Sequence, residues 1–334
     1  MKISISSPFP ADSLQGNSVS GRRISGLLSD AGHQVEIFQD GFAADCDFLI
    51  ALNAWRSAGV IEQFATVQGT VSDRTGYNDK VYRVQSRPGL VVIMTGSDLF
   101  PLDGILKAET LRSIQLADAI VVTQDQARDK INHPLVREIR KSIELPAEII
   151  DYEGFPKRTT PPFRGMLVAH LREQKNPFLY LRSIPHLKTP IQIHHYGNAN
   201  SMEFRENAGK YSSEAYEWKG EVPRSDLLKA LKNADFLLNT SYIEGSSNAI
   251  YESIALGTPI IASAIPGNIG VLGKDYPGLF HLDDSKSLAS ILDTFSTSES
   301  FRNQIQKWCD ALKVDFDPRR EQKDWCDLLA ELTV

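Results

Sequence analysis

Short apolar runs rich in β-branched residues alternate along the chain with segments whose apolar residues recur at helical spacing. The apolar runs predict strands in two series: residues 3–6, 34–38, 48–51, 90–94 and 120–123, then 165–169, 191–196, 216–218, 236–239 and 259–262. The helical spacing predicts helices that include residues 21–31, 176–184, 224–233 and 248–256. Continuous apolar strands alternating with helices are typical of buried parallel sheets. Two such series predict two doubly wound α/β domains.

The stretch YEGFPKRTTPPFRG, residues 152–165, is rich in Pro, Gly and Thr and has no periodicity, as expected of a linker. We therefore predict an N-terminal domain at 1–155 and a C-terminal domain at 156–315. Residues 316–334 form a last helical pattern, which is predicted to cross back to the N-terminal domain. Residues 68–88 are polar and fit neither period, so they are either a functional loop or an unstructured insertion.

Composition and charge narrow the class of protein. The net charge of −6 argues against nucleic acid or an anionic membrane as a partner. The start, MKISISSPFP, lacks the apolar stretch of a signal peptide, and no apolar run approaches the about 20 residues that span a bilayer. Three widely spaced cysteines form neither a disulfide framework nor a metal knuckle. We expect a cytoplasmic protein without a bound metal, a nucleic-acid partner or membrane insertion.

The strongest chemical motif is EGSSNAIYE, which follows the predicted strand at 236–239 and opens a helix. Its small residues Ser246, Ser247 and Asn248 form a turn whose backbone amides can face a phosphate. Glu244 lies in the loop, where it can meet sugar hydroxyls. Glu252 lies about two helical turns on, and a carboxylate suits a ribose because it accepts two hydroxyl donors. A capped helix with two exposed acids is the alternative.

A second motif, HLREQKNP, follows the first strand of the second domain and contains Arg172 and Lys175. Ligands of open α/β sheets bind beyond the carboxyl ends of the strands. An Arg and a Lys at that place suit a diphosphate, since Arg offers a planar fork and Lys a point charge. Solvated surface charge is the alternative.

In the first domain, Gly16 and Asn17 precede the helix predicted at 21–31, which contains Arg23. A glycine beside a helix N-terminus lets backbone N–H groups approach an anion. A plain turn is the alternative, and a structural salt bridge is the alternative for the arginine. The chain contains neither a GxGxxG fingerprint nor a P-loop, which argues against simple NAD or ATP sites.

Two further segments follow predicted strands of this domain. They are NAWRSA, which contains Arg56, and TGSD, which contains Thr95, Ser97 and Asp98. Because the carboxyl ends of parallel strands share one edge of a sheet, these residues are predicted to line one side of a ligand cleft. Arg56 would add positive charge there, or form a structural salt bridge.

With these motifs in place, residues 164–292 resemble GT-B glycosyltransferases of family 4. The likeness rests on Arg172 with Lys175, on the turn WKGEV that ends at Val222, and on two glutamates with seven residues between them. The family implies two Rossmann-like domains that face each other across a cleft. It also implies a nucleotide-sugar donor held mainly by the C-terminal domain, with its base, uracil, near the backbone of Val222.

The resemblance also implies roles for the charged residues. Arg172 and Lys175 would hold the donor diphosphate and stabilise the charge of the leaving UDP. Glu244 would face the sugar, and Glu252 would bind the ribose. The amides of residues 246–248 would contact phosphate or sugar.

A closer resemblance covers most of the chain and is to one branch of the family, the selenosugar synthases of selenoneine biosynthesis. The stretches that carry it are GNSVSGRRISGLLSDAGHQV, LIALNAWRSA, VVIMTGSDLF, LADAIVV, HLREQKNP, EGSSNAIYE and IPGNIGVLGKDYPGLF. Enzymes of this branch join a UDP-sugar to selenophosphate and give a 1-selenosugar. Trp55 stands where the branch often has arginine, and residues 68–88 are not part of its pattern.

The residues after the strand at 90–94 bear on the acceptor. Family 4 enzymes often carry a histidine there, where this chain reads TGSD. A hydroxyl acceptor usually needs a general base, whereas selenophosphate is already an anion and a soft nucleophile. It needs a positive pocket, which the Gly16 loop and the two arginines could supply, with hydrogen bonds from Thr95 and Ser97. Asp98 remains a possible base for a hydroxyl acceptor.

The resemblance therefore implies a selenosugar synthase that transfers a hexosyl group to selenophosphate, with no cofactor. The donor would be UDP-glucose or UDP-N-acetylglucosamine. One alternative is a conventional family 4 glycosyltransferase with a hydroxyl acceptor. Another is a nucleotide-sugar-binding protein without transfer activity, against which the presence of Arg172, Lys175, Glu244 and Glu252 argues.

Overall fold

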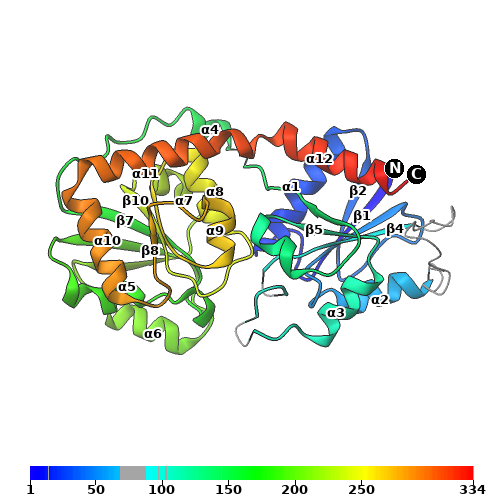
Figure 1. Ribbon diagram of the computed structural model, residues 1–334, viewed down its shortest axis with the longest axis horizontal. Helices are drawn as coiled ribbons and strands as arrows, with labels where there is room; N and C mark the ends of the chain where they lie inside the picture. The colour runs from blue at the N-terminus through cyan, green and yellow to red at the C-terminus, as the bar shows by residue number, and fades with distance from the viewer. Residues whose placement is uncertain (14, 68–87, 97, 102–103, 144, 334) are drawn as a thin grey trace. The chain divides into compact units, whose positions relative to one another are not determined.

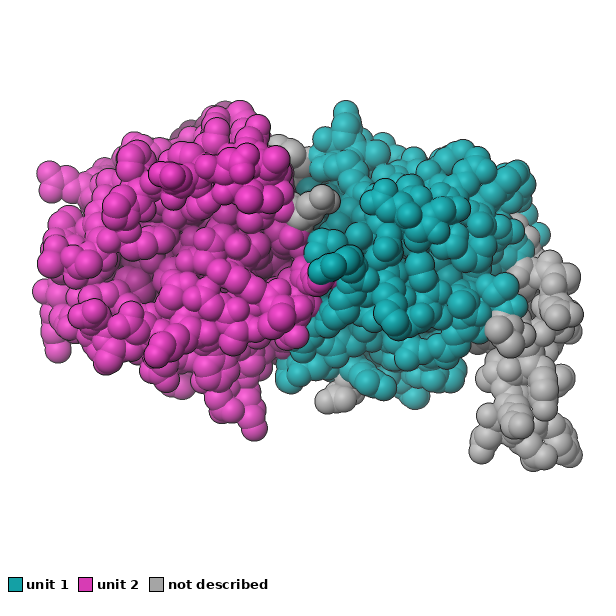
Figure 2. Space-filling view, turned by 90° about the horizontal axis from the view of Figure 1, so that it is seen from above, with its two compact units in different colours: residues 1–141, 318–334 teal, residues 142–317 magenta. Residues whose placement is uncertain are grey.

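The computed structural model describes residues 1–13, 15–67, 88–96, 98–101, 104–143 and 145–333. The chain forms two compact units, which Figure 2 colours separately: residues 1–141 with 318–334, and residues 142–317. Of the polar loop expected at 68–88, all but Pro88 lies outside the described residues. No helix among the described residues is long and apolar enough to cross a membrane.

The first unit is built on a six-stranded parallel sheet of order β2-β1-β3-β4-β5-β6. Its strands are β1 (Lys2–Ser7), β2 (Gln34–Gln39), β3 (Phe48–Leu52), β4 (Gly89–Ile93), β5 (Ala119–Val122) and β6 (Val136–Glu138). Its helices are α1 (Gly16–Asp30), α2 (Ala58–Val67), α3 (Ala108–Leu116), the 3-10 helix η2 (Asp125–Lys130) and α12 (Pro318–Glu331). Strands β3, β4 and β5 are buried along their whole length, as their unbroken apolar sequences require.

Successive residues of a strand point to opposite faces of the sheet, so each face of this sheet has its own core. On one face, alternate residues of β3 and β4 pack against α1 and α12, which lie side by side (Figure 1). On the other face, the remaining residues of these strands pack against α2 and α3. The core side chains of the helices are Ile24, Leu28, Trp325 and Leu328 on the first face, and Ile61, Phe64 and Ile114 on the second.

The second unit holds a six-stranded parallel sheet of order β12-β11-β10-β7-β8-β9. Its strands are β7 (Phe163–Val168), β8 (Ile191–Tyr196), β9 (Tyr216–Gly220), β10 (Phe236–Asn239), β11 (Ile260–Ser263) and β12 (Leu279–Phe280). Its α-helices are α4 (Ala147–Ile150), α5 (Leu179–Ser183), α6 (Met202–Lys210), α7 (Arg224–Asn233), α8 (Asn248–Leu256), α9 (Pro266–Leu272), α10 (Ser285–Thr297) and α11 (Glu299–Leu312). The 3-10 helices are η3 (Glu173–Lys175), η4 (Ile184–His186) and η5 (Lys313–Phe316).

The first helix begins at Gly16, five residues before the predicted start at 21. Its first turns are polar and small, so the apolar period on which the prediction rested starts only later. Gly21 then lies against the sheet, where an added Cβ would come 3.3 Å from the Leu52 side chain. A small residue at this place lets the helix pack closely on β3.

The boundaries of the units differ from those predicted at 155 and 315. The segment from 142 onward belongs to the second unit, because Ile143 packs against its core and α4 is held to α7. The Lys232 ammonium donates to the Ile149 carbonyl at 3.0 Å, and the Phe155 N–H donates to Asn233 Oδ1 at 2.9 Å. Residues 318–334 pack in the first unit.

Candidate functional site

The best-organised polar cluster of the second unit lies where its strand order reverses. The first strand of this sheet, β7, is flanked by β8 on one side and by β10 on the other. The loops that leave β7 and β10 therefore part at a crevice beyond the carboxyl ends of the strands, which is where open α/β sheets bind ligands. The first of these loops leads to Lys175, and the second carries Glu244.

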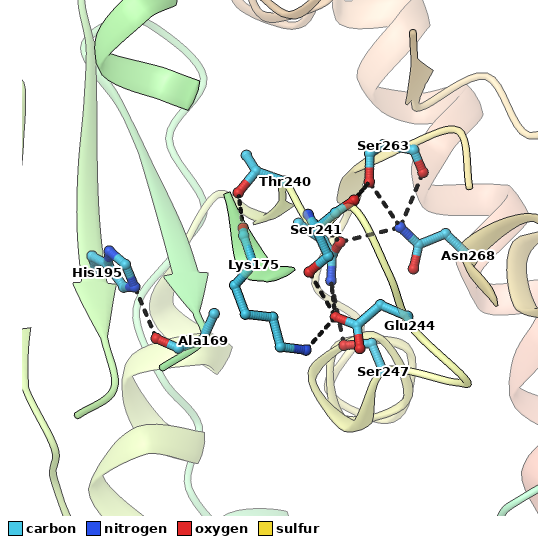
Figure 3. Close-up of polar contacts among 10 residues, drawn as sticks. Ala169, Lys175, His195, Thr240, Ser241, Glu244, Ser247, Ser263 and Asn268 are labelled. Carbon is cyan, nitrogen blue, oxygen red and sulfur yellow. Dashed lines mark hydrogen bonds and ion pairs between the residues drawn. The ribbon is translucent and has the colours of Figure 1, made fainter. Parts of the chain in front are cut away.

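An ion pair joins the two loops. Lys175 Nζ lies 2.6 Å from Glu244 Oε1, and the two side chains are only 15% and 9% exposed (Figure 3). Two hydrogen bonds to backbone carbonyls fasten the same loops: Thr240 Oγ1 donates to the Lys175 carbonyl at 2.9 Å, and the Tyr242 N–H donates to the Gln174 carbonyl at 2.9 Å. Lys175 is thus not a solvated surface charge.

The donors around Glu244 gather on one of its two oxygens. Oε1 accepts hydrogen bonds from Lys175 at 2.6 Å, Ser241 Oγ at 2.7 Å and Asn239 Nδ2 at 3.3 Å. Oε2 makes no hydrogen bond to any residue that the structure describes. This oxygen is also not fully buried. One oxygen is therefore anchored, and the other remains available to the hydroxyls of a ligand.

Glu244 is held ionised although it is buried. Burial by itself would raise the pKa of this carboxyl, but the Lys175 charge and the hydrogen bonds from Lys175, Ser241 and Asn239 outweigh it, so the pKa is lowered. Below its pKa the group would lose its charge and the ion pair. The arrangement thus keeps an acceptor-only carboxylate beside a cation at neutral pH.

The turn between Glu244 and α8 is also buried. Ser246 and Ser247 are 8% and 7% exposed. Ser247 is the N-cap of α8 in an extended conformation, and its side chain makes no capping hydrogen bond. Asn248 lies in the first turn of the helix, so the free amides of this turn and the helix dipole would stabilise an anion placed before it.

The second glutamate of the motif, Glu252, is only 4% exposed. Its Oε1 lies 2.6 Å from Arg224 Nη1 at the start of the neighbouring helix α7. The two glutamates are thus buried, and the alternative of a capped helix with two exposed acids is wrong. Arg224 was not singled out from the sequence, although it lies two residues after Val222, which is half-buried in the turn before α7.

Arg172 is the half-buried N-cap residue of η3, with an extended backbone. The preceding strand, β7, ends near His195 of the neighbouring strand β8. The ring of His195 is buried and links the loop after β7 to the sheet. Because His195 Nε2 lies 2.9 Å from the Ala169 carbonyl, Nε2 must donate, and Nδ1 accepts the Tyr216 hydroxyl at 2.8 Å. Burial lowers the pKa of His195 to about 4. The neutral ring therefore orients the start of the Lys175 loop (Figure 3).

In the first unit, Asp98 organises the loops that follow β3 and β4. This buried carboxylate accepts the N–H groups of Ala54 at 2.9 Å, Thr95 at 2.9 Å and Gly96 at 2.7 Å. Asn53 Nδ2 joins the same loops by donating to Thr95 Oγ1 at 2.8 Å. Burial raises the pKa of Asp98, but both of its oxygens are engaged by backbone amides. Asp98 thus holds loops together, which is not the position of a general base.

The two arginines predicted on the acceptor side, Arg23 and Arg56, differ in their partners. Arg23 donates to both oxygens of Glu321 in α12 at 3.0 Å, and the two side chains are 16% and 1% exposed. The expectation that Arg23 binds an anion is therefore wrong. Arg56 is exposed, and its guanidinium lies 5.0 Å from the Trp55 ring and 5.4 Å from the Phe9 ring.

A lysine that the sequence did not single out lies beside Arg56. Lys107 Nζ is 3.3 Å from the centroid of the Trp55 ring, so two cations share one indole, an attractive arrangement for each of them. Neither cation forms an ion pair with a described residue.

Gly16 and Asn17 lie in the first turn of α1, whose N-cap residue Gln15 makes no side-chain cap. Ser97 lies outside the described residues.

The described residues contain no group of three or more His, Cys, Asp or Glu side chains placed to hold a metal ion. The two histidines of β8 point to opposite faces, since His195 is buried and His194 is half-buried.

Comparison with curated proteins finds similarity in part of the chain. Protein CapJ of Staphylococcus aureus is 28% identical over 145 residues, which are 42% of this chain and 37% of CapJ. Glycosyltransferase 1 domain-containing protein 1 of Xenopus tropicalis is 32% identical over 126 residues, or 38% of this chain and 33% of that protein. The chain thus spans well under half the length of these two relatives.

Two solved structures are similar to this chain over 99% of its length. Sucrose-phosphate synthase from Thermosynechococcus elongatus superposes with a TM-score of 0.75 at 13% identity, over 99% of this chain and 98% of that one. HepE of Anabaena, solved in complex with UDP-glucose, gives a TM-score of 0.74 at 13% identity, over 99% and 100%. At this identity the similarity concerns the fold, and it confirms the predicted α/β class with two Rossmann-like units of GT-B type.

The family model described as glycosyl transferases group 1 matches residues 156–308. This range contains the reversal of strand order between β7 and β10, with Lys175, Glu244 and Glu252 around it. Residues 156–308 are therefore similar to the group 1 glycosyl transferases.

Proposed function

We propose that the protein transfers a hexosyl group from a UDP-sugar to selenophosphate, forming a C–Se bond and releasing UDP. The observation that carries the donor half of this proposal is the buried Lys175–Glu244 pair, at 2.6 Å, at the reversal of strand order. HepE, a structural neighbour of the chain, is bound to UDP-glucose in its crystal structure, which supports a donor of this class.

The second unit supplies groups for each part of the donor. Lys175 has three N–H donors, of which one meets Glu244, so the others can hold the diphosphate. The amides at the start of α8 and Arg172 add positive potential for the leaving UDP, which takes the electron pair of the broken C1–O bond. Oε2 of Glu244 accepts sugar hydroxyls. Glu252 accepts the ribose hydroxyls, which either displace Arg224 from this carboxylate or bind next to it.

The acceptor half rests on the first unit. Selenophosphate brings its own negative charge and attacks C1 through selenium, so it needs cations and no general base. Arg56 and Lys107, both on Trp55, are cations suited to such an oxyanion. The residue that could have served as a base for a hydroxyl, Asp98, has its oxygens on backbone amides. These contacts favour selenophosphate over a hydroxyl acceptor.

The proposal is tested by incubating the protein with UDP-glucose or UDP-N-acetylglucosamine, with and without selenophosphate. We expect UDP release that depends on selenophosphate, and a selenium-containing sugar in the mass spectrum. Transfer to a sugar hydroxyl, without formation of a selenosugar, would show a conventional glycosyltransferase with a hydroxyl acceptor. Binding of the UDP-sugar without any transfer would show a binding protein, and no binding would refute the donor site.

Substitution of the two cations around Trp55 should act on the acceptor alone. Arg56→Ala or Lys107→Ala is each expected to raise the KM for selenophosphate about tenfold, because each removes one charge-assisted contact. The affinity for UDP-glucose should stay within about twofold. Arg128→Ala, which removes an exposed arginine from η2 of the same unit, is the control. Loss of UDP-glucose affinity with an unchanged KM for selenophosphate would contradict the assignment.

A further inference from the structure

Behind Glu244 lies a buried cluster of uncharged polar side chains. Asn239 ends β10, Ser241 follows it, Ser263 ends β11 and Asn268 lies in the first turn of α9. Their exposed fractions are between 0% and 6%. Buried polar groups are costly unless they are hydrogen-bonded, so the way these groups pair decides how each of them is oriented.

The orientation is set from Asn268. Its Nδ2 donates to the Ser263 carbonyl at 3.0 Å and to Asn239 Oδ1 at 3.1 Å (Asn268 and Ser263 are labelled in Figure 3). The same nitrogen lies 3.3 Å from Ser263 Oγ, while Asn268 Oδ1 is buried and has no partner among the described residues. The Ser263 carbonyl can only accept, so it fixes which end of the Asn268 amide faces the cluster. Asn239 Oδ1 also accepts the Ser241 N–H at 3.3 Å. The oxygen of the Asn239 amide is therefore committed to this side of the cluster.

With its oxygen committed, the Asn239 amide presents its nitrogen on the other side. Asn239 Nδ2 donates to Glu244 Oε1 at 3.3 Å and lies 3.4 Å from Ser247 Oγ. Ser263 Oγ donates to the Ser241 carbonyl at 2.7 Å, and Ser241 Oγ in turn donates to Glu244 Oε1 at 2.7 Å. Both branches thus deliver donors to the same carboxylate oxygen and leave Oε2 to a ligand.

The backbone allows α9 to reach this place. An added Cβ at Gly267 would come 2.0 Å from the Glu244 carbonyl oxygen, a distance at which real atoms clash. Only glycine lets the N-terminal turn of α9 approach the Glu244 loop so closely. The next residue, Asn268, is thereby brought to Asn239.

We propose that Asn268 and Asn239 form an amide relay that anchors Glu244 by one oxygen and turns the other toward the donor sugar. The relay rests on the proposed role of Glu244 in binding that sugar. Asn239 and Asn268 are positioning residues: they act through Glu244 and touch no substrate. The relay depends on polarity, because each amide can be turned by 180° only if its partner changes from donor to acceptor.

Reversing the polarity at its origin tests the relay. Asn268→Asp places an acceptor where Nδ2 donates, so Asn239 must turn to donate to it and then presents Oδ1 to Glu244. We expect the Kd for UDP-glucose to rise about tenfold, the effect of losing one hydrogen bond to a charged group. The Kd for UDP, which has no sugar to meet Glu244, should change by less than about twofold. Both are measured by isothermal titration calorimetry.

Asn268→Ala is the second variant, since it introduces no buried charge. Without Asn268 only the longer hydrogen bond from the Ser241 N–H, at 3.3 Å, still orients the Asn239 amide. The ratio of the two Kd values should therefore shift in the same direction by a smaller factor. The matched control is Thr258→Val. It removes a buried hydrogen bond from Thr258 Oγ1 to the Leu231 carbonyl, at 2.9 Å. Thr258 lies just before β11, at the amino end of that strand.

A fall of both affinities by one factor, or unchanged affinities with a lower thermal midpoint, would show a merely structural role and overturn the relay. Failure of the unmodified protein to bind UDP-glucose would instead overturn the proposed function, and the relay with it.

Discussion

Lys175→Ala is expected to lower kcat for sugar transfer about 100-fold or more, the usual effect of removing one group that stabilises the leaving charge. In the proposed reaction the pyrophosphate of UDP gains negative charge as the C1–O bond breaks. Lys175 is the cation that the fold holds at this place, 15% exposed and 2.6 Å from Glu244. Steady-state kinetics with saturating UDP-glucose and selenophosphate measure the loss.

The matched control is Lys188→Ala, which removes the same charge from an exposed position just before β8. This position lies at the amino ends of the strands, whereas the Lys175 loop follows the carboxyl end of β7. We expect its kcat to equal that of the unmodified protein. Equal activities of the two variants would refute the assignment of Lys175. Circular dichroism of both variants separates a loss of activity from a loss of folding.

Lys175→Ala should also change the pH dependence of donor binding. The pKa of Glu244 is lowered because the Lys175 charge and the hydrogen bonds outweigh burial. Binding through the carboxylate is therefore present above this pKa and is lost as the pH falls through it. Removal of Lys175 raises the pKa, so the loss of UDP-glucose binding on acidification should begin at a higher pH.

Arg23→Ala is expected to lower the free energy of unfolding of the first unit by about 3 kcal/mol. Glu321, which is 1% exposed, would keep a buried carboxylate without its guanidinium, and removing one partner of a buried ion pair costs about 3–5 kcal/mol. The bidentate geometry, with distances of 3.0 Å to both oxygens, places this pair among the strong ones. Urea denaturation followed by circular dichroism measures the change.

An exposed ion pair on the same helix supplies the comparison. The side chains of Lys323 and Asp327 are 72% and 63% exposed, and such pairs contribute about 0.3–0.5 kcal/mol. Lys323→Ala should therefore leave the urea midpoint almost unchanged. If the two variants were equally stable, the Arg23–Glu321 pair would have no special part in holding α12.

Where one segment carries its own signal, the sequence was sufficient to predict the fold. The predicted bounds of β8, β10, α7 and α8 agree with the structure, since each is an apolar run or helical period closed by polar residues or glycine. Gly257, with φ of 71°, ends α8 in this way. Strands β6 and β12 were missed because three half-buried residues and two residues are too short to show a period.

The site was predictable only as far as charge and motif reach. Glu244 and Lys175 stand in recognisable segments, and the structure brings them together. Asn239 and Asn268 are 29 positions apart, and neither an uncharged amide nor its orientation leaves a pattern in a sequence. Arg23 shows the converse, because its charge suggested an anion while its partner lies 298 positions away.

The pairing of α1 with α12 also bears on the order in which the chain can fold during synthesis. The core beneath α1 includes Trp325, Leu328 and Leu329, which leave the ribosome only after the whole of residues 142–317. The second unit is continuous in sequence and can complete its core as soon as it is made, whereas the first must wait with one apolar face uncovered. For this protein the usual order, in which the N-terminal domain folds first, is therefore reversed at the final step.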